Sequence, residues 1–294
     1  MERSAYYRNR VLPWLLLAPQ LILVLVFFYW PTSQALYWAF TLEQPWGGGN
    51  SWVGLQNFIS IFGDKSYWST VLRSGLYAAV TTGISMSIAL VLASFVDRSL
   101  KGTKFFQSVY VWPYAIAAPA AGVAFRFIFA PESGLIGALN TIWPGLWNPA
   151  INGGQALLMV MVCHAWLGIG YNFIFFLAAL QMIPRSISEA GAMDGARPVR
   201  RLFDLQLPLI APTVFFLMIM NLISSFTDSF GLIDVMTEGG PFGQTEVMVY
   251  KIYFDGFKTL DYSGAAAQSI VLMLIVIALT FVQFKWVERR VHYN

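Results

Sequence analysis

Hydrophobic residues fall in long uninterrupted runs, and short polar connections separate one run from the next. Six runs reach about 20 residues or more, the length that an apolar helix needs to cross a bilayer. They cover residues of about 12–40, 74–96, 105–129, 156–180, 209–233 and 265–287. No long stretch outside them is left to build a soluble domain. The pattern predicts an all-α polytopic membrane protein with six transmembrane helices in a single domain over residues 1–294.

The connection over residues 184–208 is the polar segment with the clearest helix signals. Ser186, followed three positions later by Glu189, forms a capping-box pattern that predicts a helix starting at Ile187. Gly195 is placed to end this helix in a left-handed conformation. The segment therefore predicts a helix of about two turns, roughly 12 Å long, between two membrane spans.

Small residues occupy one face of this short helix. Ile187, Ala190, Gly191 and Asp194 share that face by the helical spacing of three and four. The small side chains of Ala190 and Gly191 let another backbone approach closely. A partner that docks there and an amphipathic loop that lies on the lipid surface fit this pattern about equally well. Pro198 is placed to open a second helix.

Composition supports the membrane prediction and excludes some classes of function. Hydrophobic residues make up 57% of the chain and charged residues 11%, whereas a soluble domain has about 25% charged residues. No Gly-Lys-Ser/Thr sequence occurs, so the chain has no nucleotide-binding loop of its own. The single cysteine, Cys163, is interpreted as a small core residue of a span. The first run has no clear small-residue cleavage site and is interpreted as an uncleaved anchor.

Basic residues are concentrated on one side of the predicted spans. They precede the first run, separate the second from the third and the fourth from the fifth, and follow the sixth. Most of the 18 Lys and Arg occupy these positions: Arg3, Arg8, Arg10, Arg98, Lys101, Lys104, Arg185, Arg197, Arg200, Arg201, Lys285, Arg289 and Arg290. Both termini and the 184–208 connection are therefore predicted to be cytoplasmic. The same bias accounts for the net charge of +3, which gives no reason to expect nucleic acid as a partner.

Five polar side chains in the predicted spans are candidates for a solute pathway. A charged group at a helix centre costs about 2.5–3.5 kcal/mol on insertion scales, so such groups tend to face a cavity or a partner. Asp228 is the main candidate, with Asn221 and Ser225 near it by helical spacing. For Asn172 and Asn221, an interhelical hydrogen bond is the favoured alternative. Arg126 either attracts an anion or extends to the outer interface, two interpretations of equal weight.

The sequence does not favour a metal site or catalysis. His164 has no second metal-ligating side chain three or four residues away, which disfavours a metal site. Ser224, His164 and Asp228 have the residue types of a hydrolytic triad, but nothing in the sequence brings them together and no Gly-x-Ser-x-Gly turn is present. A secondary transporter would need ion-coupling groups in interrupted helices, and Asp228 alone gives little support for one.

The 184–208 connection resembles the EAA loop of type I ABC-importer permeases. The residues that carry the resemblance are Glu189-Ala190-Gly191, Asp194-Gly195-Ala196, Phe203 and Leu207-Pro208. Gly191 replaces the usual second alanine, a small residue for a small residue. The Asp-Gly-Ala sequence is similar to the carbohydrate-uptake branch of the family, which includes the maltose permeases. Gly239-Gly240-Pro241 and Tyr250-Lys251-Ile252-Tyr253 resemble the same branch.

Longer stretches are similar to the A-type permeases of sn-glycerol-3-phosphate importers. They are residues 171–173, 180–186, 200–201, 207–212, 266–269 and 282–284, and the likeness extends over most of the chain. This resemblance implies uptake of sn-glycerol-3-phosphate or related glycerophosphodiesters. A sugar or oligosaccharide is the alternative, because related permeases share a scaffold and differ in a few lining residues.

The resemblance implies a type I ABC-importer permease fold and a defined set of partners. Such a permease pairs with a second homologous permease, and two copies of an ABC ATPase, which bind ATP and Mg, sit beneath the pair. A periplasmic or extracellular solute-binding protein delivers the solute. The chain itself is then expected to have no catalytic residue, to bind no cofactor or metal, and to lie in the lipid of the bacterial inner membrane as a multi-pass protein.

The resemblance also assigns a role to the short cytoplasmic helix. In the family, the EAA helix docks in a cleft of an ATPase subunit, so that ATP-driven closure moves the membrane spans. Carried over to this sequence, Glu189, Ala190, Asp194 and Gly195 form the docking element. Gly191 stands at the position that varies from the family pattern.

A second set of roles concerns the solute. Family permeases hold it among spans four to six, which implies Asn172, Asn221, Ser225 and Asp228 as candidate contacts. An ionised Asp228 would repel a phosphate group that came near it. Either the partner permease supplies the cations for a phosphate, or Asp228 has a structural role.

Overall fold

The computed structural model describes residues 11–43, 49–98 and 103–288. The chain forms two compact units, Met1–Asp64 with Ile252–Val271, and Lys65–Lys251 with Leu272–Asn294. The last two α-helices contribute residues to both units. The expectation of a single domain over residues 1–294 stays a prediction.

The first unit consists of a long apolar helix, a small sheet and further helical segments. Its elements are α1 (Leu12–Val24), the π-helical η1 (Leu25–Tyr29), α2 (Trp30–Ala39), β1 (Thr41–Glu43), β2 (Asn50–Trp52), α3 (Gln56–Gly63), the end of α14 (Met248–Tyr253), the π-helical η4 (Phe254–Lys258) and the start of α15 (Tyr262–Glu288). The two strands pair antiparallel, with Thr41 opposite Trp52, and they are an unpredicted addition to the helical fold. The amide of Glu43 donates to Ser263 Oγ at 2.9 Å, which ties the sheet to α15.

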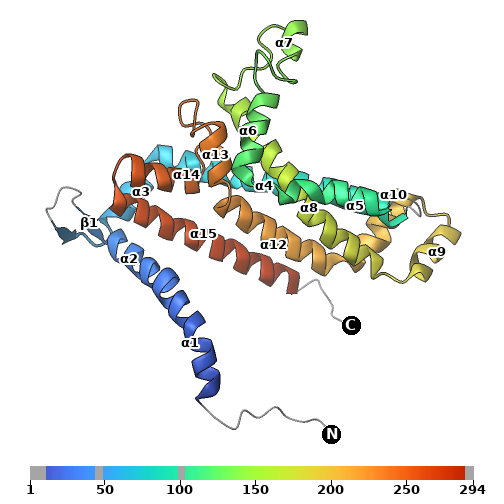
Figure 1. Ribbon diagram of the computed structural model, residues 1–294, viewed down its shortest axis with the longest axis horizontal. Helices are drawn as coiled ribbons and strands as arrows, with labels where there is room; N and C mark the ends of the chain where they lie inside the picture. The colour runs from blue at the N-terminus through green and yellow to red at the C-terminus, as the bar shows by residue number, and fades with distance from the viewer. Residues whose placement is uncertain (1–10, 44–48, 99–102, 289–294) are drawn as a thin grey trace. The chain divides into compact units, whose positions relative to one another are not determined.

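The second unit is a helical bundle built around α8 (Gly153–Gln181). Its other elements are α4 (Lys65–Arg98), α5 (Thr103–Val111), the 3-10 helix η2 (Trp112–Ala115), α6 (Ala118–Ile128), α7 (Leu139–Ile142), α9 (Arg185–Met193), α10 (Pro198–Arg200), the π-helical η3 (Arg201–Gln206), α11 (Leu207–Leu209), α12 (Ala211–Thr227) and α13 (Phe230–Met236), with the start of α14 and the end of α15. α8 contacts α4, α5, η2, α6, α12 and α13, and Figure 1 shows α5 and α12 on either side of it.

The core of this bundle combines aromatic residues with small ones. Phe173 and Phe176 of α8 and Leu217 of α12 are fully buried in one cluster with Ala89 and Ala93 of α4. Small residues on α4 allow the helices to come close, and close packing is the main source of helix association in lipid. The region between α4, α8 and α12 therefore contains a closely packed core of the second unit.

The fold-class prediction is confirmed by the lengths and hydropathy of the helices. Within the described residues, four helices are long and apolar enough to cross a membrane: Leu12–Ala39, Lys65–Asp97, Gly153–Gln181 and Tyr262–Lys285. Two bent pairs bring the number to six if each pair is one span, namely Phe105–Ala115 with Ala118–Ile128, and Pro198–Leu209 with Ala211–Thr227.

Two predicted spans have different bounds in the structure. The second begins at Lys65 rather than at about 74, because the polar residues Thr70 and Ser74 are buried inside the bundle instead of ending the helix. The fifth ends at Thr227 rather than at about 233, because Asp228 caps the helix and a separate helix follows. Hydropathy alone misplaced the start of the second span and the end of the fifth, because both depend on the hydrogen bonds and burial of polar side chains.

The third predicted span is broken rather than continuous. Its two halves meet at 99°, and the backbone is extended at Ile116 and Ala117. Pro119 stands in the first turn of α6, where the missing proline amide leaves no hydrogen bond unmade. The break therefore lies between Pro113 and Pro119, two prolines that interrupt regular helix within this span. The break places Tyr114 and the start of α6 on the wall of one cavity.

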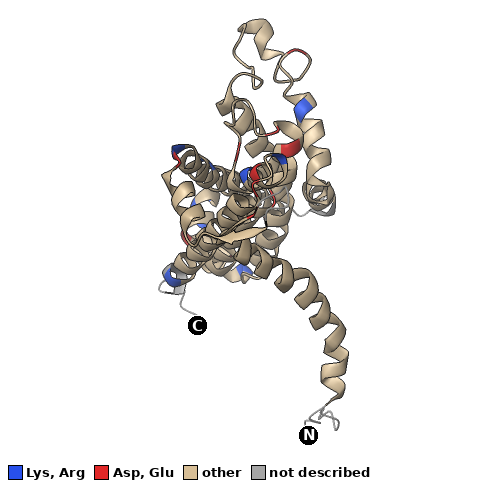
Figure 2. Ribbon diagram, turned by 90° about the vertical axis from the view of Figure 1, so that its left-hand side faces the viewer, with Lys and Arg blue, Asp and Glu red and all other residues tan. Residues whose placement is uncertain are grey.

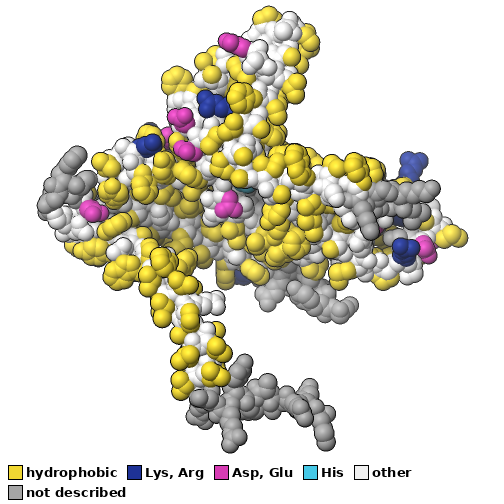
Figure 3. All heavy atoms as spheres, viewed as in Figure 1, with side chains coloured by type: hydrophobic (Ala, Val, Ile, Leu, Met, Phe, Trp, Pro, Cys, Tyr) yellow, Lys and Arg dark blue, Asp and Glu magenta, His cyan; other side chains and the backbone are white. Residues whose placement is uncertain are grey.

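Charged residues are few on the described helices. Figure 2 shows long stretches of ribbon without Lys, Arg, Asp or Glu, and in Figure 3 hydrophobic side chains cover most of the visible face. In Figure 3 basic and acidic side chains are seen at the end where α9 and α10 lie, and others are scattered over the rest of the visible face. Part of the charge bias used to predict orientation lies outside the described residues: Arg3, Arg8, Arg10, Lys101, Arg289 and Arg290.

Candidate functional site

The first candidate site is the α9 segment, residues Arg185–Leu209, which connects α8 to α12. α9 begins at Arg185, two residues earlier than predicted, with Pro184 at the N-cap. No side-chain hydrogen bond caps this helix, so the predicted capping box of Ser186 and Glu189 is wrong. The early start places Ser186 inside the first turn, where its hydroxyl does not occupy the N-cap position.

The C-terminal end of α9 agrees with the prediction. Gly195 has a φ of +77°. Its amide donates to Ala192 O, and the amide of Ala196 donates to Gly191 O, both at 3.0 Å. These two bonds form a Schellman motif, which favours glycine at its left-handed position. Pro198 then opens α10, as expected.

The predicted small-residue face is divided between two sides of α9. Gly191 is buried, and a Cβ atom at this position would lie 2.6 Å from Leu205 Cδ1 of η3. On the same side, Ser188 O accepts a hydrogen bond from Arg201 Nη1 at 3.2 Å. The Ser188 hydroxyl accepts one from Gln206 Nε2 at 3.4 Å. Gly191 is therefore small because a helix of the same chain packs against it.

The opposite side of α9 is open. Glu189, Ala190 and Asp194 are exposed, and the side chain of Met193 is 89% exposed. Among the described residues, none forms an ion pair or a side-chain hydrogen bond with Glu189 or Asp194. Figure 1 shows α9 at one end of the bundle, beyond the ends of α5 and α8. This surface can meet another protein without first losing an internal bond.

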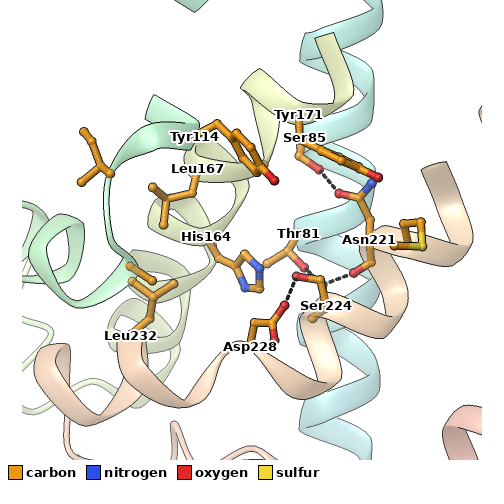
Figure 4. Close-up of a pocket in the computed structure, with 15 residues that line it drawn as sticks. Thr81, Ser85, Tyr114, His164, Leu167, Tyr171, Asn221, Ser224, Asp228 and Leu232 are labelled. Carbon is orange, nitrogen blue, oxygen red and sulfur yellow. Dashed lines mark hydrogen bonds between the residues drawn. The ribbon is translucent and has the colours of Figure 1, made fainter. Parts of the chain in front are cut away.

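The second candidate site is a cavity of about 330 Å³ inside the bundle. Its wall is formed by residues of α4, η2, α6, α8, α12 and α13. In Figure 4 the polar side chains of Thr81, Ser85 and Asn221 gather on one side, and Leu167 and Leu232 lie on the other. The cavity therefore has one polar and one apolar wall.

Asn172 and Asn221 form a reciprocal amide pair between α8 and α12. Asn221 Nδ2 donates to Asn172 Oδ1 at 2.6 Å, and Asn172 Nδ2 donates to Asn221 Oδ1 at 3.0 Å. Asn172 Nδ2 also donates to Ser85 Oγ of α4 at 3.2 Å. Asn172 is fully buried, and of the two amides only Asn221 lines the cavity. The interhelical hydrogen bond that the sequence favoured is thus present for both residues.

Ser225 and Asp228 lie on the cavity wall about one turn apart. Ser225 is buried, and its hydroxyl lies 2.9 Å from Thr81 Oγ1 of α4. Asp228 is exposed at the C-cap of α12. One of its carboxylate oxygens accepts from Ser224 Oγ at 2.8 Å, and the other from Thr227 Oγ1 at 3.0 Å. The structure therefore brings three predicted residues to one wall: Asn221, Ser225 and Asp228.

His164 of α8 lines the same cavity, although we expected nothing to bring it near Ser224 and Asp228. Its Nδ1 atom lies 2.7 Å from the hydroxyl of Tyr77, a fully buried residue of α4. The three polar residues do not form a catalytic relay, because Ser224 donates directly to Asp228 and His164 binds Tyr77. Among the described residues, no group of three His, Cys, Asp or Glu could hold a metal ion.

Arg126 lies away from this cavity. It lines a second cavity of about 380 Å³ together with Met236 at the end of α13 and the turn at Gly240 and Pro241. Arg126 Nη1 donates to Val235 O at 3.2 Å. In the part of the chain that the structure describes, no Lys or Arg lines the first cavity. Among the predicted pathway residues, Arg126 is thus separated from the polar wall.

The hydroxyl residues of α4 are the part of the site that we did not predict. Thr81 and Ser85 line the cavity and bind groups of α8 and α12. They continue to Ala89 and Ala93 at every fourth position, and all four residues are buried. Small residues at this spacing are a known signal for close helix packing in membranes. The same signal would have identified this face of α4 from the sequence.

Known proteins similar to this chain are transporter permeases. A sequence model of the family described as binding-protein-dependent transport system inner membrane component matches residues 9–293. The sn-glycerol-3-phosphate transport system permease protein UgpA of Agrobacterium fabrum is 44% identical over 292 residues, which cover 99% of this chain and 100% of the relative. The protein of the same name from Yersinia enterocolitica is 46% identical over 283 residues, which cover 96% of each chain.

Solved structures of similar fold are also transporters. A chain in the crystal structure of a bacterial ABC transporter involved in the import of the acidic polysaccharide alginate matches with a TM-score of 0.81 and 20% identity, covering 96% of both chains. A chain in the alginate transporter in complex with its alginate pentasaccharide-bound periplasmic protein matches with a TM-score of 0.77 and 19% identity, covering 92% of both. At these identities the likeness shows the fold, and it confirms the expected type I importer-permease fold.

Proposed function

The chain belongs to the binding-protein-dependent transport system inner membrane components, and on that premise we propose that it is the permease subunit of an ATP-driven importer of sn-glycerol-3-phosphate. The proposed substrate rests on one observation: the chain is 43–46% identical, over essentially its full length, to several permeases named for this solute. Glycerophosphodiesters, which contain the same phosphorylated glycerol group, are included in the proposal.

The proposed assembly contains partners that supply what this chain lacks. A second homologous permease completes the membrane pathway, two copies of an ABC ATPase bind ATP and Mg and hydrolyse the nucleotide, and a solute-binding protein delivers the solute. This chain itself performs no hydrolysis and holds no cofactor. The absence of a Gly-Lys-Ser/Thr sequence from the chain supports this division of labour.

The α9 segment is the proposed contact with the ATPase. Its open side presents Glu189, Ala190 and Asp194, and its inner side is joined to η3 by the packing of Gly191. η3 continues through α11 and an 80° bend into α12, which lines the cavity. A displacement of α9 is therefore transmitted to the cavity wall through bonded and closely packed groups. Gly195 keeps the turn at the end of α9 in the conformation that this arrangement needs.

The proposed orientation follows from the basic residues. With both termini and the α9 segment on the cytoplasmic side of a bacterial inner membrane, Arg185, Arg197, Arg200 and Arg201 lie on the side that basic residues favour. The same orientation places the open surface of α9 where a cytoplasmic ATPase can reach it. Membrane lipid then surrounds the apolar helices, which carry few charges on the face seen in Figure 3.

The cavity is the proposed contact with the solute. Asn221, Ser225 and Asp228 line one wall, and no Lys or Arg of the described residues lines the cavity. An anionic phosphate is therefore neutralised by the partner permease, because the carboxylate of Asp228 repels it on this side. Asn172 serves this site indirectly, through its hydrogen bonds to Asn221.

Reconstitution tests the proposal. The four membrane and ATPase subunits are placed in liposomes with ATP inside and the binding protein outside, and uptake of labelled sn-glycerol-3-phosphate, a glycerophosphodiester and a disaccharide is measured. We expect uptake of the first two solutes that stops when ATP, the ATPase or the binding protein is omitted. Uptake of the disaccharide and of neither phosphorylated solute would show that the chain is a permease for sugars. Uptake by this chain alone, driven by an ion gradient, would refute the ATP-driven mechanism.

A further inference from the structure

A histidine held by a buried tyrosine lines the cavity from α8. Tyr77 of α4 has no exposed surface, and its hydroxyl lies 2.7 Å from Nδ1 of His164. The two rings lie 5.5 Å apart between centroids. His164 itself is half-buried and lines the cavity, and no described residue binds its Nε2 atom. The imidazole is therefore fixed at one nitrogen and free at the other.

The hydrogen bond to Tyr77 sets the tautomer of a neutral His164. A buried phenol proton needs an acceptor, and among the described residues Nδ1 is the only partner of the Tyr77 hydroxyl. If Nδ1 carried the proton instead, the phenol proton would be buried without an acceptor, an arrangement that proteins avoid. The Tyr77 hydroxyl therefore donates to Nδ1, and the imidazole proton resides on Nε2. The cavity wall thus presents an N–H donor.

An acceptor faces this donor. Figure 4 shows the ring of His164 and the carboxylate of Asp228 turned toward the same part of the cavity, which both residues line. Each carboxylate oxygen accepts one hydrogen bond from a hydroxyl of α12 and keeps a second lone pair. A solute hydroxyl both donates and accepts, so one hydroxyl can accept from Nε2 and donate to the carboxylate.

We propose that His164 and Asp228 bind a hydroxyl of the glycerol group of the transported solute, with Tyr77 as the residue that positions His164. This inference rests on the proposed function and names which part of the solute meets this chain. A phosphate is the wrong ligand for the pair, because its oxygens only accept and carry negative charge beside Asp228. The glycerol end of the solute therefore faces α8 and α12, and the phosphate faces away from them.

The test compares three solutes in the complete importer reconstituted in liposomes. They are sn-glycerol-3-phosphate, propane-1,2-diol phosphate, which lacks the terminal hydroxyl, and propane-1,3-diol phosphate, which lacks the central one. The maximal uptake rate is measured with the binding protein saturated by each solute. Differences in the binding protein's affinity for the three solutes then do not affect the rate. For His164→Phe, which keeps the ring and loses both nitrogens, we expect about a tenfold lower rate for the full solute, the value of one well-made hydrogen bond.

The pattern across solutes separates recognition from misfolding. His164→Phe is expected to slow uptake of the full solute and of the analogue that keeps the bound hydroxyl, and to leave the analogue without that hydroxyl unchanged. His164→Gln, which can place an amide N–H near the Nε2 position, is expected to restore most of the rate. Tyr77→Phe is expected to cause a smaller loss with the same pattern.

Tyr67→Phe is the matched control, since Tyr67 is a buried tyrosine of the same helix whose hydroxyl has no partner among the described residues. It is expected to leave all three rates unchanged. Equal losses for all three solutes in His164→Phe, or no loss at all, would overturn the inference while wild-type uptake of sn-glycerol-3-phosphate still supports the proposed function. Failure of the wild-type importer to carry any of the three solutes would overturn both.

Discussion

The α9 segment and the cavity wall use polar residues in opposite ways. On the open side of α9, Glu189 and Asp194 have no side-chain partner among the described residues. At the cavity, the side chains of Asn221 and Ser225 on the wall, and of Asn172 buried behind it, are all bound to groups on other helices. Water can solvate the polar groups on the open side of α9 when no partner protein is bound, whereas lipid cannot solvate polar groups inside the bundle. The surroundings of each region decide whether its polar groups are left open.

The two regions also differ in what maintains their shape. The α9 segment keeps its shape through backbone geometry, with Gly191 against Leu205 and Gly195 in a left-handed turn. The cavity wall keeps its shape through side-chain pairs such as Asn172 with Asn221. A change of side chain on the open side of α9 should therefore affect contact with the ATPase, and a change at the cavity wall should affect the bundle itself.

Charge reversal on α9 should have the largest effect. Glu189→Lys places a cation on the surface proposed to meet the ATPase, and reversing a charge at such an interface costs about 2–5 kcal/mol. We expect at least a 30-fold loss of uptake, by the relation of about 1.4 kcal/mol per tenfold. The bundle should be unaffected, since Glu189 is exposed. Uptake and the melting temperature of the purified permease pair are the two measurements. A lowered melting temperature would show that the two regions are not independent.

Filling the inner side of α9 should have the next largest effect. Gly191→Ile pushes a branched side chain into η3 and should lower uptake about tenfold, the effect of overpacking by about 1–3 kcal/mol. Gly191→Ala is the matched variant. Its Cβ would lie too close to the terminal methyl of Leu205, which can rotate away, and at an ordinary contact distance of 3.6 Å from two carbons of Arg201. Uptake should therefore stay within about twofold. Equal losses in both variants would mean that the backbone, and not side-chain volume, limits this contact.

Removal of half of the amide pair should have a moderate effect on stability. Asn172→Leu leaves Asn221 with fewer partners and should cost about 1 kcal/mol, near the upper range measured for interhelical hydrogen bonds in membranes. The melting temperature of the permease pair in detergent should fall by a few degrees. The melting temperature of the double variant, Asn172→Leu with Asn221→Leu, should be no lower than that of the less stable single variant. Additive losses in the double variant would contradict a direct pair.

Removal of the hydroxyl of Ser186 should have the smallest effect. Because Ser186 makes no capping hydrogen bond, Ser186→Ala should change stability by less than about 0.5 kcal/mol, against about 1 kcal/mol for a true N-cap. Uptake should remain at the wild-type level. A loss as large as that of Gly191→Ile would show that the hydroxyl contacts the ATPase directly.

Local signals in the sequence predicted the ends of elements when one residue decided them. Gly195 was correctly placed at the end of α9 and Pro198 at the start of α10, because a left-handed turn and a first helical turn depend on one residue each. The capping box of Ser186 and Glu189 failed because the helix starts two residues earlier, after Pro184. The sequence pattern is compatible with either start.

Contacts between distant residues could not be predicted in the same way. The cost of polar groups in lipid singled out Asn172 and Asn221 one at a time, and the structure shows that each is the partner of the other. The same reasoning grouped Arg126 with them, yet it lines a different cavity. For His164 the sequence argued against a metal site but did not indicate its partner, Tyr77, which lies on another helix. A single sequence shows which residues need partners and does not show which partners they have.

The contact between Gly191 and Leu205 limits how this protein family can change. A side chain larger than that of alanine at position 191 must be matched by room at position 205, so such substitutions should appear together across related permeases. A permease with a branched residue at the first site should carry a smaller residue at the second. Alanine, the usual residue of the family, needs only the rotation of one leucine methyl group, so glycine and alanine can exchange at this site while position 205, fourteen residues downstream, stays the same.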